Sequence, residues 1–345
     1  GLNAVIRAVV RSALGRGLKV RGIQNGFGGL VENQIIEMND KNVSGILPRG
    51  GTILGTTNRD NPFRYAIKEN GQTVYRDMSR HAMENIRNAG IEALVVIGGD
   101  GSLAIASELA KLGLAVVAVP KTIDNDIPGT ERTFGFDTAV AVATEALDRL
   151  HTTAESHHRV MLLEVMGRYA GWIALHSGIA GGADCILIPE IPFRIESVLK
   201  KIQQRQDHGK RFSLIVVAEG AKPEGGDVTV ARIVEGSHEK VRLGGVGEKL
   251  AREIENMSGI ESRCTVLGHL QRGGSPTPFD RVLSTRYGVA AVDCLMDSQT
   301  GYMVALKQNS IIRVPIGEIA GKTHNVPLDN ELVKAAKAIG ISFGQ

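Results

Sequence analysis

The sequence predicts an α/β fold of mostly parallel, doubly wound sheets, arranged in two domains. Three observations support this. Apolar runs of five to eight residues alternate with amphipathic segments along most of the chain. Several of these runs are apolar throughout, as in strands buried on both faces of a sheet. The length of 345 residues is sufficient for two domains of roughly 150–200 residues each.

The elements follow from spacing and from turn residues. Apolar residues at helical spacing predict helices over 3–14, 76–90, 103–113 and 136–153. Two of these end at glycines, Gly90 and Gly113, which are suited to cap a helix C-terminus. Strands are predicted over 18–24, 93–97, 114–119, 159–166, 186–191, 213–220 and 263–270.

The bulk composition excludes some classes of function. The net charge is only +3 and aromatic residues make up 4%, which is low for a nucleic-acid binder that stacks bases. We find no apolar run of membrane-spanning length and no signal peptide. The three cysteines are far apart and form no CxxC motif, which favours a reducing cytoplasm.

A glycine-rich turn, GGDGS at 98–102, follows one apolar run and precedes a helix. Because glycine has no Cβ, backbone N–H groups there can approach an anion, and the helix N-terminus adds partial positive charge. Asp100 alone would repel a phosphate, so we expect it to bind Mg²⁺, directly or through water. The alternative is a tight turn in which Asp100 caps the helix. The turn is neither a Walker A motif nor GxGxxG.

The segment TIDND at 122–126 supplies two carboxylates, Asp124 and Asp126, directly after the run at 114–119. If the segment is extended, both side chains point to the same side. Two close carboxylates repel when both are ionised, so one can be held as a base. Phosphoryl transfer to an alcohol needs such a base for the hydroxyl proton. The alternative is an Asx-turn entering a loop.

Cationic side chains also occur near predicted strand ends. Arginine binds phosphate in a bidentate manner, so several arginines beside an acid pair indicate a phosphorylated substrate. Glu219, after the run at 213–218, is placed to accept hydrogen bonds from a sugar hydroxyl. The cationic set comprises the MGR segment at 166–168, Arg159, Arg263, His269 and Arg272.

Taken together, these motifs resemble the 6-phosphofructokinase family, in its bacterial ATP-dependent type, over almost the whole chain. In order, they are GGTILGT at 50–56, GGDGS, PKTIDND, EVMGRYAGW at 164–172, the AEG turn and RCTVLGHLQRGGSP at 263–276. The resemblance implies two Rossmann-like three-layer domains with the active site in the cleft between them. It assigns 1–135 plus 271–320 to a nucleotide-binding domain and 136–270 plus 321–345 to a sugar-phosphate-binding domain.

The resemblance also implies transfer of the γ-phosphate of ATP to the C1 hydroxyl of fructose 6-phosphate, with Mg²⁺ as cofactor. It makes Asp124 the general base, places Asp126 near the metal and Thr122 beside the transferring phosphoryl group, and links Asp100 to Mg²⁺ through water. Arg168 serves both catalysis and sugar binding. The remaining nucleotide contacts are Gly101, Ser102 and Arg59. The remaining sugar-phosphate contacts are Met166, Gly167, Glu219, His269 and Arg272.

The resemblance further implies a homo-oligomer, because the family is usually a homotetramer. Arg159 and Arg263 are similar to arginines that enter the site from a neighbouring subunit. An effector site between subunits is implied by Arg7, Arg11 and Arg49, which match arginines of the bacterial allosteric members. Asp184 stands where a glutamate is common in that site.

Two residues leave the phosphoryl donor open. Family members that use pyrophosphate tend to have aspartate at the position of Gly101 and lysine at that of Lys121, so the two markers disagree here. An aspartate at 101 would add a side chain and a charge where the α-phosphate of ATP passes, whereas glycine leaves that path open. Lys121 is compatible with both donors. We therefore expect ATP, with a pyrophosphate-dependent phosphofructokinase as the alternative.

Two further alternatives are a kinase of the NAD- or lipid-kinase type and a non-catalytic, sugar-phosphate-sensing subunit. GGDG turns occur in those kinases, but HLQRGGSP and MGR are not expected there. The sensing subunit is considered because the family's opening strand and GGDxPG turn should precede Gly1. We expect that segment to lie upstream of the given sequence.

Overall fold

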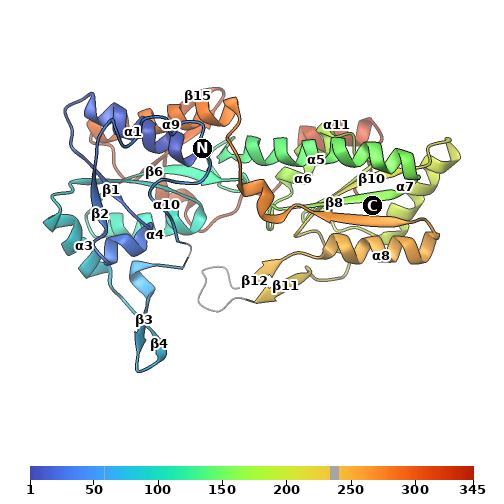
Figure 1. Ribbon diagram of the computed structural model, residues 1–345, viewed down its shortest axis with the longest axis horizontal. Helices are drawn as coiled ribbons and strands as arrows, with labels where there is room; N and C mark the ends of the chain where they lie inside the picture. The colour runs from blue at the N-terminus through green and yellow to red at the C-terminus, as the bar shows by residue number, and fades with distance from the viewer. Residues whose placement is uncertain (58, 234–240) are drawn as a thin grey trace.

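Two sheets, each covered by helices on both faces, form two lobes that lie side by side (Figure 1). The computed structural model describes residues 1–57, 59–233 and 241–345. The N-terminus lies in one lobe and the C-terminus in the other (Figure 1). Among the described residues, no helix has the length and apolar character needed to span a bilayer.

The N-terminal lobe is built on a five-stranded sheet with the order β15-β14-β6-β5, in which β7 pairs with the end of β6. The strands are β5 (Ala93–Gly98), β6 (Ala115–Thr122), β7 (Phe134–Gly135), β14 (Tyr302–Lys307) and β15 (Ser310–Pro315). All pairs are parallel except that between β14 and β15.

Strand β6 is apolar on both sides because helices cover both faces of this sheet. Val117 and Val119 pack in the same cluster as residues of α1 (Leu2–Leu14) and α9 (Pro278–Met296). Val116 and Ala118 pack in the cluster that contains α4 (Asp100–Lys111) and α10 (Ile316–Ile319).

The second lobe is built on a four-stranded parallel sheet with the order β13-β8-β10-β9. The strands are β8 (Val160–Val165), β9 (Cys185–Leu187), β10 (Ser213–Ala218) and β13 (Ser262–Val266). Every residue of β8 and β10 is buried. One face packs against α5 (Phe136–His157) and α6 (Trp172–Ala180), and the other against α7 (Ile195–Asp207) and α8 (Val246–Ser258).

The other strands form antiparallel pairs outside the two main sheets. These pairs are β1 (Val20–Ile23) with β2 (Ile35–Met38), β3 (Tyr65–Glu69) with β4 (Gln72–Arg76), and β11 (Val230–Ile233) with β12 (Val241–Leu243). The short helices are α2 (Phe27–Val31), α3 (Ser79–Asn88), α11 (Glu331–Ala338), η1 (Pro62–Arg64) and η2 (Gly268–Arg272).

The expected fold class is confirmed, with differences in individual elements. The strand predicted over 263–270 ends at Val266, and its last residues belong to η2 instead. The strand predicted over 18–24 forms as β1, but it joins an antiparallel pair rather than a parallel sheet, because only part of it is buried. The strand predicted over 186–191 ends at Leu187, since Pro189 has no N–H for the ladder. Strand β6 continues to Thr122, into the TIDND motif. The division of the chain into two sequence-defined domains stays a prediction, with which the two sheets are compatible.

Candidate active site

The carboxyl ends of five parallel strands carry the predicted motifs toward one region between the lobes. β5 and β6 end at GGDGS and TIDND, while β8, β10 and β13 are followed by MGR, Glu219 and HLQR. Across the two lobes, Arg168 Nη1 lies 3.6 Å from Asp100 Oδ1. The glycine-rich turn of one sheet therefore meets the MGR segment of the other, as expected for ligands bound at the carboxyl ends of parallel strands.

The glycine-rich turn is held by close packing at one glycine and is open at another. A Cβ on Gly98 would lie 2.2 Å from Cβ of Ser102, so only glycine fits there. A Cβ on Gly101 would meet nothing within 4 Å. Asp100 is the first residue of α4 and makes no capping hydrogen bond, so the alternative of a helix cap is wrong. Its carboxylate is instead in the first turn, where the helix dipole favours a negative charge.

Asp124 and Asp126 lie in a buried loop and not in an extended segment. Asn125 between them has a φ of 54°, in the left-handed region, which asparagine tolerates better than most residues. Of the two possibilities left open by the sequence, the extended segment is therefore not the one that forms. The Asn125 Oδ1 accepts the N–H of Thr133 at 2.9 Å, which holds the turn. Asp124 is 3% exposed and Asp126 is 7% exposed.

Thr122 orients the Asp124 carboxylate. Its hydroxyl accepts the Asp124 N–H at 3.1 Å and donates to Asp124 Oδ2 at 3.3 Å. Asp124 Oδ1 is buried and has no hydrogen-bond partner among the described residues. A buried polar atom without a partner is unfavourable in free energy, so this oxygen is placed to accept a hydrogen bond from the hydroxyl group of a bound ligand.

The loop combines buried carboxylates and cations. Burial raises the pKa of Asp126 to about 6, and the charge of Asp124 adds to this rise while Arg168 opposes it. Burial lowers the pKa of Lys121, with Arg272 adding to the effect and Asp124 opposing it. Both shifts show that charge is poorly solvated here, so an anionic ligand would interact strongly with the cations of this region.

The MGR segment forms a left-handed turn after β8. The φ of Gly167 is 143° and that of Arg168 is 53°. The Arg168 N–H donates to Glu219 Oε1 at 3.0 Å, which ties the turn to the end of β10. A Cβ on Gly220 would lie 1.9 Å from the Arg168 carbonyl oxygen, so glycine is needed for this contact. Burial raises the pKa of Glu219 to about 7, opposed by the N–H of Arg168.

The η2 segment brings His269 and Arg272 to the same end of the sheet, with both side chains exposed. Gln271 lies between them but is buried, and its Oε1 accepts the N–H of Met166 at 2.7 Å. Gln271 and Asn125 were not among the predicted site residues. The available signal was an uncharged amide inside each charged motif, between His269 and Arg272 and between the two aspartates.

Arg159 and Arg263 lie at the amino ends of the strands of this sheet, opposite the ends that carry the motifs. Arg159 precedes β8 and Arg263 lies near the start of β13, whereas Arg168 follows the carboxyl end of β8. A six-residue strand spans roughly 20 Å, so one chain does not bring these two arginines to its own site. Both pair with Glu261 at 2.7 Å, and Arg263 also pairs with Glu255 at 3.0 Å.

The other predicted residues are not assembled by one chain either. Arg59 is exposed, and its N–H donates to Thr57 Oγ1 at 3.2 Å. Among the described interactions, none joins Arg59 to GGDGS. The predicted effector residues are divided between the lobes: Arg7 and Arg11 on α1, Arg49 in an exposed loop, and Asp184 before β9. Arg11 Nε lies 3.2 Å from Asp40 Oδ1, and Asp184 Oδ1 lies 2.6 Å from Arg205 Nη1.

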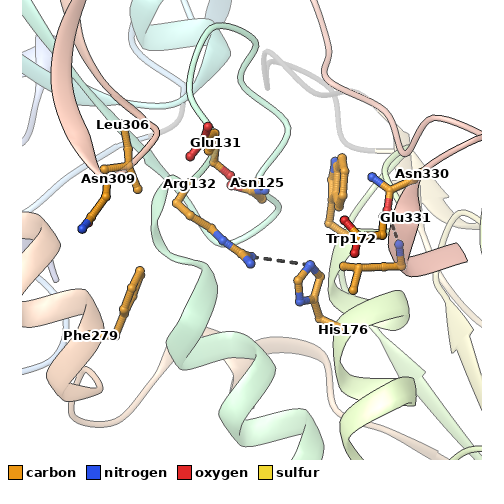
Figure 2. Close-up of a pocket in the computed structure, with 11 residues that line it drawn as sticks. Asn125, Glu131, Arg132, Trp172, His176, Phe279, Leu306, Asn309, Asn330 and Glu331 are labelled. Atoms are coloured by element: carbon orange, nitrogen blue, oxygen red, sulfur yellow. Dashed lines mark hydrogen bonds between the residues drawn. The ribbon is translucent and has the colours of Figure 1, made fainter. Parts of the chain in front are cut away.

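A cavity of about 450 Å³ lies beside the loop that contains Asn125. Figure 2 shows Arg132 and His176 pointing toward one another there, with Arg132 Nη1 3.5 Å from His176 Nε2. Burial and the Arg132 charge lower the pKa of His176 to about 4, so the ring is neutral at pH 7 and can accept this hydrogen bond. Asn125 lines the cavity, but Asp124 and Asp126 do not. The two carboxylates therefore face a different space.

Comparisons with known proteins agree with this geometry. The family described as Phosphofructokinase matches residues 1–295. The chain is 54% identical to ATP-dependent 6-phosphofructokinase 2 of Clostridium perfringens, covering 99% of this chain and 94% of the relative. It is 49% identical to a pyrophosphate–fructose 6-phosphate 1-phosphotransferase of Streptomyces coelicolor, covering 100% and 96%.

A solved structure is also similar. Phosphofructokinase from Saccharomyces cerevisiae aligns with a TM-score of 0.78 and 33% identity, over 92% of this chain. This chain spans 43% of the length of that yeast chain. The ordered strand-end motifs, the fold and these full-length similarities lead to one conclusion: the chain belongs to the phosphofructokinase family.

Proposed function

We propose that this protein is an ATP-dependent 6-phosphofructokinase, a glycolytic kinase that converts fructose 6-phosphate to fructose 1,6-bisphosphate. The observation that carries this proposal is Asp124. Its Oδ1 is buried without a partner, and its Oδ2 is held by Thr122. The loop lies beside the contact between Asp100 and Arg168, where the two lobes meet. A base oriented in this way is what transfer to an alcohol requires.

In the proposed reaction, the C1 hydroxyl oxygen of the sugar attacks the γ-phosphorus of ATP. A bond forms between these two atoms, the bond from phosphorus to the β–γ bridging oxygen breaks, and ADP leaves. Asp124 Oδ1 accepts the hydroxyl proton, while Thr122 keeps the carboxylate in the orientation needed. Arg168, already directed at Asp100 across the lobes, offsets the charge on the phosphoryl oxygens.

The residues present fit Mg²⁺ as cofactor. Asp100 and Asp126 are the side chains that would hold it, with Asp100 acting through water. The charges of Asp124 and Asp100 both act on Asp126, so three carboxylates gather where a cation would offset their repulsion. When bound, Mg²⁺ supplies charge stabilisation to the phosphates, which contribute most of its remaining ligands.

The sugar phosphate is assigned to the second lobe. The proposed contacts within one chain are Met166, Gly167, Arg168, Glu219, His269 and Arg272. We assign Arg159 and Arg263 to the site of a neighbouring copy, which requires a homo-oligomer, proposed to be a homotetramer. Their position at the amino ends of β8 and β13, where Arg159 is half-buried and Arg263 is exposed, supports this assignment, because only a second chain can use them there. The effector site of Arg7, Arg11, Arg49 and Asp184 would likewise join two copies.

ATP is the proposed donor. The open space at Gly101 supports it, since no side chain blocks the larger nucleotide there. Lys121 and the 49% identical pyrophosphate-dependent relative keep pyrophosphate as the second candidate. ATP phosphates would be contacted by Gly101, Ser102 and Arg59. A cytoplasmic location stays a prediction.

The test is an assay of purified protein with fructose 6-phosphate and each donor separately, measuring fructose 1,6-bisphosphate. We expect product with ATP and at least tenfold less with pyrophosphate. Product with pyrophosphate but not ATP would overturn the donor. Phosphorylation of NAD or of a lipid without activity on fructose 6-phosphate would favour those kinase types, and binding without turnover would favour a sensing subunit.

A further inference from the structure

We infer that Gln271 is a positioning residue that holds the Met166–Arg168 turn against the η2 segment and thereby sets the affinity for the sugar phosphate. This rests on the proposed binding roles of Arg168 and Arg272. Gln271 itself is 1% exposed, so it acts through its neighbours.

The side chain of Gln271 continues the connection between β8 and β13 beyond the end of the sheet. The last register pair joins Val266 to Glu164, and the N–H of Leu267 then donates to the Glu164 carbonyl at 3.1 Å. After this point the chain leaves the sheet as η2. The Oε1 of Gln271 supplies the next contact, accepting the Met166 N–H at 2.7 Å. A side chain thus replaces the ladder where the backbone has turned away.

The orientation of the Gln271 amide is determined by its partner. The Met166 N–H is a donor, so the amide oxygen must face it, because the reverse orientation would place two donors together. This leaves Nε2 buried without a partner among the described residues. A buried unpaired donor is unfavourable, and an apolar side chain of equal size would avoid it. The one contact that such a side chain could not make is the bond to Met166.

The turn needs such support because its backbone is left-handed at two successive residues, Gly167 and Arg168. Two side chains hold its N–H groups, Glu219 at Arg168 and Gln271 at Met166. Without Gln271, the start of the turn is free to move relative to η2. The distance between the Arg168 and Arg272 side chains would then vary, which weakens binding of a ligand that spans both.

A change at Gln271 should affect the half-saturation for the nucleotide much less. GGDGS and TIDND belong to the other sheet and follow β5 and β6. The described hydrogen bonds of Gln271 include none to these two segments. The inference therefore predicts a change in the half-saturation for the sugar phosphate that is separate from that for the nucleotide.

Two variants of nearly equal size test this. Gln271→Met removes the acceptor oxygen, whereas Gln271→Glu keeps it, because a buried carboxyl group takes up a proton and remains neutral. Gln203→Met on the exposed face of α7 is the matched control. For each protein, the half-saturation for fructose 6-phosphate and for ATP, kcat and Tm are measured.

We expect Gln271→Met to raise the half-saturation for fructose 6-phosphate by roughly tenfold, with that for ATP within about twofold. Gln271→Glu should restore most of the loss, and Gln203→Met should match the unaltered protein. An unchanged sugar half-saturation in Gln271→Met would overturn the inference, as would equal losses in both Gln271 variants. If Gln271→Met does not fold, Gln271→Asn replaces it, because its shorter side chain cannot reach Met166.

An Arg272→Ser variant separates this inference from the site assignment. If Arg272→Ser raises the sugar half-saturation and Gln271→Met does not, the role of Gln271 is refuted while the proposed site stands. If Gln271→Met raises it and Arg272→Ser does not, the assignment of Arg272 is wrong, and the inference in its present form is overturned with it.

Discussion

Replacement of Asp124 tests the proposed chemistry most directly. Asp124→Ser removes both carboxylate oxygens, including the buried Oδ1 that has no partner, and leaves a hydroxyl too short to replace it. Loss of a general base lowers turnover by about 10²–10⁴-fold. This corresponds to about 3–5 kcal/mol of transition-state stabilisation, since each tenfold change in rate is 1.36 kcal/mol. The half-saturation values for both substrates should change little, because a base acts mainly in the transition state.

The structure also predicts the effect of this variant on the folded protein. The charge of Asp124 helps to raise the pKa of Asp126, so its removal should lower that pKa toward its ordinary value. One of two repelling buried carboxylates is lost, and we therefore expect no large drop in Tm. The assay measures kcat, both half-saturation values and Tm, with Asp148→Ser on the exposed face of α5 as control. A turnover of Asp124→Ser equal to that of the unaltered protein would refute the assignment of Asp124 as the base.

Two further predictions concern affinity and stability. Arg263→Ser should raise the half-saturation for fructose 6-phosphate at least tenfold and leave Tm within about 2 °C, since its exposed ion pairs contribute only about 0–1 kcal/mol. Steady-state kinetics and thermal unfolding check this, and an unchanged half-saturation would contradict its role in a neighbouring site. Asp126→Asn should stabilise the protein above pH 6. The pKa of Asp126 is raised to about 6 in the folded state, so the folded protein favours the protonated carboxyl group. The stability that this protonation contributes is complete below the ordinary pKa near 3.8 and is lost as the pH rises through about 6, whereas asparagine stays neutral throughout. Denaturant unfolding at pH 4, 6 and 8 measures this, and an identical pH dependence in both proteins would exclude it.

The sequence allowed the strands that carry the candidate site to be predicted, because their apolar runs are typical of buried parallel strands, but the buried strand β14 was not predicted. The runs at 93–97 and 114–119 became β5 and β6, and both faces of β6 are covered as its apolar residues require. The pattern was less informative for partly exposed strands. The β1 strand was found, but its antiparallel partner was not, since pairing between short strands depends on contacts outside the local sequence.

For the candidate site, the sequence indicated residue types but left part of the geometry open. It selected Asp124 and Asp126 without deciding whether their segment is extended or a turn, and in the structure Asn125 between them adopts a left-handed conformation. The signal for Gln271 in the sequence was only that it is an uncharged amide between His269 and Arg272. Its importance depends on the Met166 N–H, 105 positions away in the chain, which no local pattern could reveal.

By itself, the sequence determined which segments form the strands that precede the site motifs and which chemical groups follow them, because both depend on local composition and spacing. Only the tertiary structure decided which of these groups meet. It brought Asp100 and Arg168 together from two sheets. It placed Arg159 and Arg263 at the amino ends of β8 and β13, away from the candidate site, because the direction of a strand decides at which of its ends a residue lies. It also decided the protonation of the buried acids, since the pKa shifts of Asp126 and Glu219 come mainly from loss of water around the carboxylates on folding.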